Sequence, residues 1–417
     1  MTQVLKAIRS GSPGTLFSAF LYFDVSFMIW ILLGPLSVYI CRDIDLTPAQ
    51  KGFLVAVPIL SGAILRIFAG ILTDQIGPRR TGLLGLALTA VPLFWGWQFA
   101  DSLRDLAAVG ILLGVAGASF AVALPLASRC YPPEHQGIAM GIAGAGNSGT
   151  VVTALLAPRL AESIGWQAVM GLALIPVAIT FAIFHLLARD SASAAPARTF
   201  RDYAALLRER DCWWFNFFYS VTFGGFVGLT SFLVLYYHEA YGLSRVAAGN
   251  LTALCVFAGS FFRPVGGYLA DRFEGVKVLS VLFPVIAVLM SVASFGLPVW
   301  AVTMVLVAAM AALGMGNGCI FQIVPRRFQN EMGLVTGIVG ACGGIGGFFL
   351  PTLFGGLKEF TNSYHDGFAV YALLPLAAVI LLQTVYHRSW SRTWLAKPAP
   401  VRPDVFGRVR MEVVFGG

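Results

Sequence analysis

Charged residues are scarce in this sequence. Asp, Glu, Lys and Arg make up only 12% of its 417 residues, whereas a soluble domain carries about 25% charged residues. Hydrophobic residues make up 58% of the chain, and a single soluble core of this length could not stay so apolar around its whole perimeter. The composition therefore excludes an ordinary soluble protein.

The patterns that bind metals or form disulfides are also missing. The six cysteines have no paired spacing and fall mostly inside or at the ends of apolar segments, so neither a disulfide framework nor a zinc knuckle is expected. Nucleophiles, bases and metal ligands are not grouped at one depth, so we expect no enzyme, no metal and no cofactor. The histidines lie apart near segment ends and do not suggest a proton relay: His135, His185, His238, His365 and His387.

Long apolar runs fill most of the chain. About 20 apolar residues cross the roughly 30 Å hydrocarbon core of a bilayer, and runs of this length recur between short polar clusters. The first run, from Thr15 to Ile40, has no cleavage site after a short core and is expected to be retained. The predicted fold is all-α and integral to the membrane, with about twelve transmembrane helices at 15–40, 51–72, 82–100, 105–128, 137–161, 165–188, 213–237, 246–270, 277–296, 298–323, 332–357 and 367–386.

Basic residues distinguish the two sides of the membrane. The net charge is +8, and most Lys and Arg lie on the side that holds both termini. By the positive-inside rule that side is cytoplasmic, so we expect a multi-pass protein of the cytoplasmic (inner) membrane, and no nucleic-acid partner. We divide the chain into a six-helix half (1–188), a cytoplasmic linker (189–211), a second six-helix half (212–387) and a cytoplasmic tail (388–417).

The two halves carry an internal repeat at an offset of 197 residues. Arg66 is followed eight residues later by Asp74, and Arg263 is followed eight residues later by Asp271. The same offset relates two pairs of glycines: Gly146 with Gly343, and Gly149 with Gly346. Two six-helix halves repeated in parallel, with a site at their interface, are typical of the major facilitator architecture.

Arg66 and Arg263 are predicted to lie near the middle of the bilayer. Each is about 12 Å from the acidic end of its helix, at 1.5 Å per residue. An ionised residue at this depth costs at least ~2.5–3.5 kcal/mol, and arginine cannot lose its proton to avoid that cost. Carboxylates or helix carbonyls could hold both arginines, but one intramembrane acid, Asp24, leaves one positive charge over. A small, flat oxyanion would supply the missing charge and suit the planar guanidinium.

Glycine runs stand at a similar depth in the helices at 137–161 and 332–357. The first contains Gly146 and Asn147, and the second contains Gly343. Glycine lets membrane helices approach closely, so ordinary helix packing is one interpretation. Their recurrence at the repeat offset favours packing around a small cavity, to which Asn147 adds a hydrogen-bonding group.

The loop after the second helix contains an acid, a glycine and paired arginines. Its spacing resembles the inner-loop motif of the major facilitator superfamily, which latches the two halves in one state. A second copy in the other half is degraded after its acid. We therefore expect a gating loop made of Asp74, Arg79, Arg80 and Asp271.

Together, the paired arginines and glycine runs resemble the nitrate/nitrite porter family of that superfamily. The family signature has Gly and Asn in the fifth helix, here Gly146-Asn147-Ser148-Gly149, and repeated Gly ending in Phe-Phe-Leu-Pro in the eleventh, here residues 346–351. The resemblance covers essentially all twelve helices. It implies that Arg66 and Arg263 grip the anion and that Asn147 hydrogen-bonds it. By the same resemblance the pocket is walled by Phe120, Tyr219 and Phe223, with Gly146 and Gly343 beside it.

The resemblance implies a monomeric secondary transporter that moves nitrate, nitrite or both by alternating access. Either proton symport or nitrate/nitrite exchange would drive it. Another small anion, a carboxylate or sulfate, is the alternative cargo, while the two-half repeat with charged loops argues against a channel. Asp24 is an acid where a pure exchanger is expected to be neutral. It is either a structural partner for one arginine or a proton-coupling site.

Overall fold

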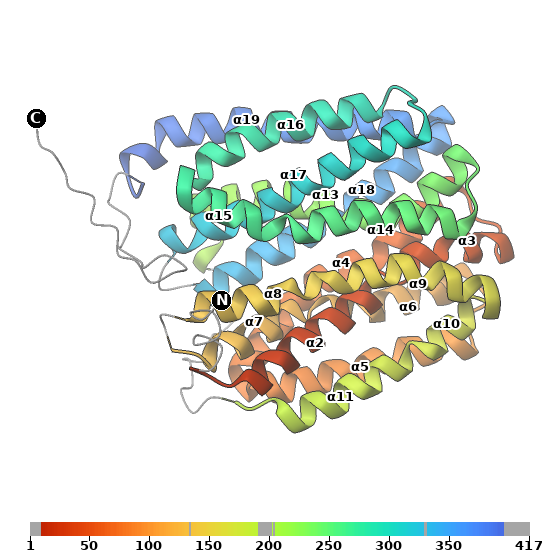
Figure 1. The fold of residues 1–417 in the computed structure, drawn as a ribbon, viewed down its shortest axis with the longest axis horizontal. Helices are drawn as coiled ribbons and strands as arrows, with labels where there is room; N and C mark the ends of the chain where they lie inside the picture. The colour runs from red at the N-terminus through yellow and green to blue at the C-terminus, as the bar shows by residue number, and fades with distance from the viewer. Residues whose placement is uncertain (1–9, 133–134, 191–201, 203–204, 329–331, 396–417) are drawn as a thin grey trace, which may run out of the picture.

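A computed structural model describes residues 10–132, 135–190, 202, 205–328 and 332–395. Helices that run roughly along one axis make up most of this part of the chain (Figure 1). Eleven helical spans within it are long and apolar enough to cross a membrane. The all-helical, multi-pass fold expected from the composition is therefore confirmed.

The first six predicted spans are present, and four of them are interrupted. A short 3₁₀ segment, η1, replaces one α-helical turn at the first glycine run, because Gly, Asn and Ser are weak helix formers. The elements are α2 (Pro13–Trp30), α3 (Leu33–Asp43), α4 (Pro48–Ile76), α5 (Pro78–Gln98), α6 (Leu103–Gly117), α7 (Phe120–Arg129), α8 (Gln136–Gly144), η1 (Ala145–Ser148), α9 (Gly149–Ile164), α10 (Trp166–Leu172) and α11 (Leu174–Leu187). Of these spans, α5 is not among the eleven, but it packs on α6 and α11 as a transmembrane neighbour would.

The second six spans are longer and less often broken. The span predicted at 246–270 is present as Arg245–Phe273, and it is broken at Phe262 because Pro264 cannot donate a backbone hydrogen bond and starts a new helix with Arg263 as its first residue. The elements are α13 (Arg210–Tyr241), α14 (Arg245–Phe261), α15 (Arg263–Phe273), α16 (Gly275–Ala293), α17 (Val299–Arg327), α18 (Met332–Thr361), α19 (His365–Arg388) and η2 (Trp390–Arg392).

Several helices extend beyond the apolar runs that predicted them. Helix α4 begins at Pro48, three residues before the predicted start, because Thr47 and Gln50 form a capping box. Its last turn continues to Ile76 through polar residues. Apolar length therefore located the helices, while capping residues determined where they begin.

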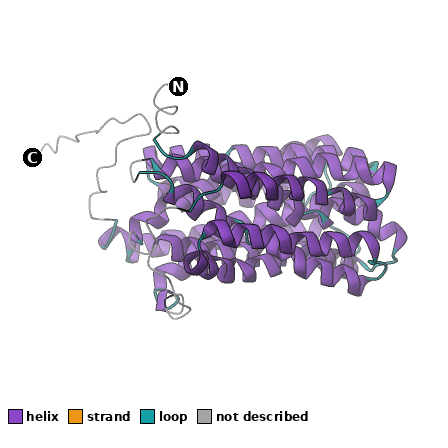
Figure 2. Cartoon of the chain, turned by 90° about the horizontal axis from the view of Figure 1, so that it is seen from below, coloured by secondary structure: helices purple, strands orange, loops and turns teal. Residues whose placement is uncertain are grey.

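The two halves pack against each other mainly along three helix pairs, with smaller contacts between α4 and α13 and between η1 and α14. Figure 1 shows the elements of the first half gathered in its lower part and those of the second half in its upper part. The halves meet where α4 packs on α18, α3 on α13, and α9 on α14. Figure 2 shows the same bundle turned by 90°, with the helices again running lengthwise. Most of the predicted linker and tail lies outside the described residues.

Helix α2 begins and α19 ends at the same end of the bundle, on the left of Figure 1. We call this the termini end, and the opposite end, where α3, α9 and α13 finish, the far end.

Candidate functional site

Arg66 is buried in the middle of the molecule and bridges the two halves. Only 1% of it is exposed. Its Nη1 donates to the carbonyl of Gly340 at 2.6 Å, in the second half, and its Nη2 donates to the carbonyl of Gly117 at 2.8 Å, in the first. Its Nε is buried and has no hydrogen-bond partner among the described residues. Neutral carbonyls therefore hold the guanidinium in place and leave its charge uncompensated.

Three aromatic rings surround the Arg66 guanidinium. Its central carbon lies 5.4 Å from the ring centroid of Phe120, 5.6 Å from that of Trp30 and 5.8 Å from that of Phe223. Rings at this distance attract a cation through their negative faces, and the attraction grows as water is removed. These contacts help to offset the cost of burying the charge.

Arg263 approaches the same region from the second half. Its guanidinium carbon lies 5.5 Å from the Phe321 ring centroid, and its Nη1 is buried without a hydrogen-bond partner among the described residues. Tyr219 lies within electrostatic reach of both arginines, and the two arginines repel each other. Two cations from opposite halves thus share one site.

The rings between the arginines form a continuous aromatic cluster. Phe321 packs on Tyr219 at 5.0 Å and on Phe120 at 6.0 Å between centroids, and Tyr219 stacks on Phe223 at 5.0 Å. Tyr219, Phe223 and Phe120 are the three aromatic residues that the family resemblance assigned to the pocket. The structure brings all three beside the arginines.

Asp24 does not neutralise either arginine in this structure. Its Oδ1 accepts a hydrogen bond from the Ser148 hydroxyl at 2.6 Å. Within the described part of the chain, no ion pair involves Arg66 or Arg263. No contact in this structure therefore supports Asp24 as a structural partner of an arginine. Each arginine keeps an unpaired N–H that could donate a hydrogen bond to an anion.

The glycine run of α18 allows this helix to sit between α4 and α13. A Cβ added at Gly343 would lie 2.5 Å from Cδ1 of Tyr219, and one at Gly344 would lie 2.7 Å from the Cβ of Ala63. At Gly340 an added Cβ would come within 3.2 Å of the Arg66 guanidinium. Close backbone packing and proximity to the arginines therefore occur together in this run.

The glycine run of the first half packs on α2 instead. A Cβ at Gly146 would lie 2.7 Å from Cδ1 of Phe23. Asn147, in η1, is 3% exposed, and its Oδ1 has no hydrogen-bond partner among the described residues. Asn147 is thus a buried amide with an unused polar atom, and the hydrogen bonds of the described residues connect it to neither arginine.

The structure places the predicted gating-loop residues at helix ends: Asp74 is in the last turn of α4, and Arg79 and Arg80 are in the first turn of α5. The contacts of Asp74 and Arg79 stay within the first half and the start of the linker. Asp74 pairs with Arg129 at 2.5 Å, and Arg79 bonds the carbonyl of His185 at 2.8 Å and, through its backbone N–H, Asp190 at 2.9 Å. Arg80 is exposed, and Asp271 occupies the matching position near the end of α15.

Sequence reasoning missed four contributors to this site. Trp30 and Phe321 carried no motif that distinguished them from other membrane aromatics. The carbonyls of Gly117 and Gly340 are backbone groups, so residue type says little about them, although Gly340 does open the second glycine run.

Comparison with known proteins places the chain in a family. Residues 16–351 match the Major Facilitator Superfamily. A nitrite extrusion protein of Bacillus subtilis (strain 168) is 34% identical over 368 residues, which are 88% of this chain and 93% of the relative. A probable nitrate/nitrite antiporter, NarK1 of Thermus thermophilus, is 33% identical over 394 residues, covering 87% of this chain and 88% of the relative.

The fold also matches a solved transporter structure. A bacterial homologue of the human lysosomal transporter Spinster, crystallised in an inward-facing and occupied conformation, superimposes with a TM-score of 0.66 at 19% identity. The match covers 91% of this chain and 97% of that structure. At this identity the likeness concerns the fold alone.

Proposed function

The chain belongs to the major facilitator superfamily, and we propose that it is a secondary active transporter that moves nitrate, nitrite or both across the cytoplasmic membrane by alternating access. Two relatives that align with most of its length are named for nitrite extrusion and for nitrate/nitrite antiport. Their names supply the cargo class, and the site supplies the chemistry.

The observation that carries this proposal is the unpaired positive charge at the interface. Arg66 and Arg263 come from opposite halves, stand among aromatic rings, and each hold one buried N–H without a partner among the described residues. A planar oxyanion accepts parallel hydrogen bonds from a guanidinium. Nitrate and nitrite fit because they are small, flat and anionic, and they would remove the repulsion between the two cations.

Alternating access is supported by a difference between the two ends of the bundle. At the far end, the ion pairs Lys51–Glu239 (2.7 Å) and Arg245–Glu162 (3.8 Å) join the two halves. At the termini end, the ion pair Asp74–Arg129 stays within the first half, and Arg327 pairs with Asp211 at the end of the linker, in the first turn of α13. With both termini in the cytoplasm, the far end faces the outside, and the two ion pairs that join the halves there support a carrier closed to the outside.

Asp24 is the proposed proton-coupling residue of this carrier. The Ser148 hydroxyl donates to its carboxylate, and a hydroxyl can also accept a hydrogen bond from a protonated carboxyl. Ser148 can therefore serve either charge state of Asp24 without rearrangement of η1. In this scheme the linker (189–211) and tail (388–417) are cytoplasmic, and the carrier works as a monomer.

The test is anion flux in liposomes that contain the purified chain. Nitrate inside the liposomes should exchange for external nitrite, and Arg66→Gln should abolish this exchange while the protein remains inserted. Arg104→Gln, at an exposed position in the first turn of α6, is the matched control and should retain wild-type flux. Wild-type exchange in Arg66→Gln would overturn the site. Sulfate or carboxylate flux without nitrate or nitrite flux would overturn the cargo.

A further inference from the structure

Two equivalent close contacts between helix backbones join the halves at the far end. Gly249 of α14 packs on the carbonyl of Ala154 in α9, where an added Cβ would lie 2.7 Å from the oxygen. Gly52 of α4 packs in the same way on the carbonyl of Pro351 in α18. By the 197-residue offset of the internal repeat, Gly52 is equivalent to Gly249, and Ala154 is equivalent to Pro351. The two crossings are therefore the same contact with the halves exchanged.

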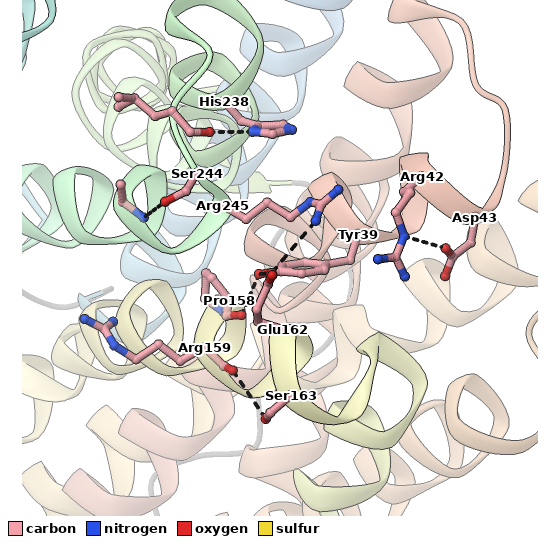
Figure 3. Close-up of polar contacts among 12 residues, drawn as sticks. Tyr39, Arg42, Asp43, Pro158, Arg159, Glu162, Ser163, His238, Ser244 and Arg245 are labelled. Carbon is pink, nitrogen blue, oxygen red and sulfur yellow. Dashed lines mark hydrogen bonds and ion pairs between the residues drawn. The ribbon is translucent and has the colours of Figure 1, made fainter.

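A carboxylate stands beside each crossing. Glu162, near the end of α9, lies 3.8 Å from Arg245, the first residue of α14 (Figure 3). Glu359, near the end of α18, accepts a hydrogen bond at 3.0 Å from the backbone N–H of Ala49, in the first turn of α4. The same offset converts Glu162 into Glu359. In each case a carboxylate from one half reaches the start of a helix from the other, where the helix dipole favours negative charge.

Tyr39 extends the contact around Glu162. Its hydroxyl oxygen lies 2.9 Å from Glu162 Oε2 and 2.6 Å from the Pro158 carbonyl, and its ring centroid lies 5.0 Å from the guanidinium carbon of Arg245 (Figure 3). Arg245, from the second half, is therefore held by a ring and a carboxylate of the first. An open cavity of about 360 Å³ adjoins this cluster, lined in part by Glu162 and Arg245, so water can reach the pair.

The far end also has contacts between the halves that the repeat does not duplicate. Lys51 pairs with Glu239 at 2.7 Å, and the Tyr364 hydroxyl donates to the same carboxylate at 2.5 Å. The offset converts Lys51 into Ala248 and Glu239 into Arg42, so this pair has no counterpart. Arg159 of α9 also donates to the Asn250 side chain of α14 at 2.6 Å, and the offset relates these residues to Gly356 and Phe53, so this contact has no counterpart either. The glycine crossings and their carboxylates are repeated in both halves, whereas these two contacts are not.

We propose that Glu162 and Glu359 form a paired carboxylate gate at the far end. Each must release its partner in the opposite half before the far end opens, so together they set the balance between the far-end-closed and far-end-open states. This inference rests on the proposed alternating-access carrier, and it assigns these two residues to the conformational step and not to anion binding.

The gate is tested by measuring how often the far end is open. Spin labels at Ser163→Cys and Phe360→Cys report the separation of the halves there, because both positions are exposed, follow the two gate carboxylates and are themselves related by the offset. The background replaces the six native cysteines. Pulsed electron–electron double resonance in liposomes then gives the distribution of distances between the two labels. The ratio of long to short distances measures how often the far end is open.

Removal of a gate carboxylate should shift that ratio toward the open state. Exposed ion pairs contribute about 0.2–1 kcal/mol, and a carboxylate at a helix N-terminus contributes about 0.3–1 kcal/mol. Glu162→Ala and Glu359→Ala should therefore each raise the ratio roughly 1.4- to 5-fold, and the double substitution should multiply the two effects. Alanine is compatible with both exposed helix ends. Glu274→Ala, which removes the Glu274–Lys277 pair within one half, is the matched control and should leave the ratio unchanged.

The outcomes separate the gate from the cargo. An unchanged ratio in both single substitutions and in the double would overturn the gate, even if the labelled background still exchanges nitrate for nitrite. A shifted ratio in a background that carries neither anion would support the gate and overturn the proposed cargo.

Discussion

Replacement of Arg66 by lysine isolates the geometry of the guanidinium from its charge. In the structure, two nitrogens of Arg66 are fully engaged with carbonyls of opposite halves, Gly340 at 2.6 Å and Gly117 at 2.8 Å, while Nε remains buried and unpaired. A lysine carries the same charge on a single nitrogen. A lysine can donate to one of these carbonyls or to the anion, but its ammonium donors cannot reproduce the planar arrangement of the guanidinium N–H groups.

The size of the effect follows from the hydrogen bonds that a lysine cannot make. Hydrogen bonds to charged groups contribute about 1.5–3 kcal/mol each. If Arg66→Lys loses one such bond to the anion, the affinity should fall about 10- to 150-fold, since each 1.4 kcal/mol is roughly a factor of ten. The carbonyl that loses its donor is buried, so the substitution should also lower the melting temperature of the detergent-solubilised protein.

The assay is nitrate/nitrite counterflow in liposomes at external nitrite concentrations that span the half-saturation value. We expect the half-saturation concentration to rise at least about tenfold in Arg66→Lys, with Arg104→Lys unchanged. Saturation at the wild-type concentration in Arg66→Lys would show that charge alone recruits the anion. It would also refute the role assigned to the guanidinium plane.

Three further substitutions probe the other elements of the site. Arg263→Lys should weaken anion affinity in the same counterflow assay, because it removes the planar guanidinium whose buried Nη1 has no hydrogen-bond partner among the described residues. Gly343→Leu should reduce flux at least about tenfold, since even its Cβ would lie 2.5 Å from the Tyr219 ring; Val288→Leu, at a position 61% exposed, should leave flux unchanged. Asp24→Asn should lose nitrate accumulation driven by a pH gradient while retaining nitrate/nitrite exchange, and continued accumulation would exclude Asp24 as the coupling site.

The sequence predicted the helices and the charged pair for simple physical reasons. A membrane helix needs a long apolar run, and a charge inside such a run is rare enough to draw attention. Arg66 and Arg263 stood out in this way, and the repeat offset indicated that they belong to equivalent helices. The structure brings both into one aromatic cluster.

The hydrogen bonds that hold Arg66 could not be predicted in the same way. Its acceptors are backbone carbonyls, which every residue carries, and Gly340 lies 274 positions away in the chain. The break before Arg263 was available from Pro264, but apolar length dominated the prediction there. The repeat is visible in the sequence at the arginines and glycines. The equivalence of Glu162 and Glu359 indicates a function only together with the contacts that each makes to the opposite half.

The glycine face of α18 has a consequence for how easily the two halves can move. Side chains that interlock across a helix interface must leave and re-enter their rotamers whenever the helices slide, and each such rearrangement adds to the activation barrier. Where Gly344 meets Ala63 and Gly346 meets the backbone of Ser220, there are almost no rotamers to rearrange. The helix that carries the Gly340 carbonyl can therefore shift against both neighbours with little side-chain repacking, and the speed of reorientation is set by polar contacts: the Arg66–Gly340 hydrogen bond and those at the far end.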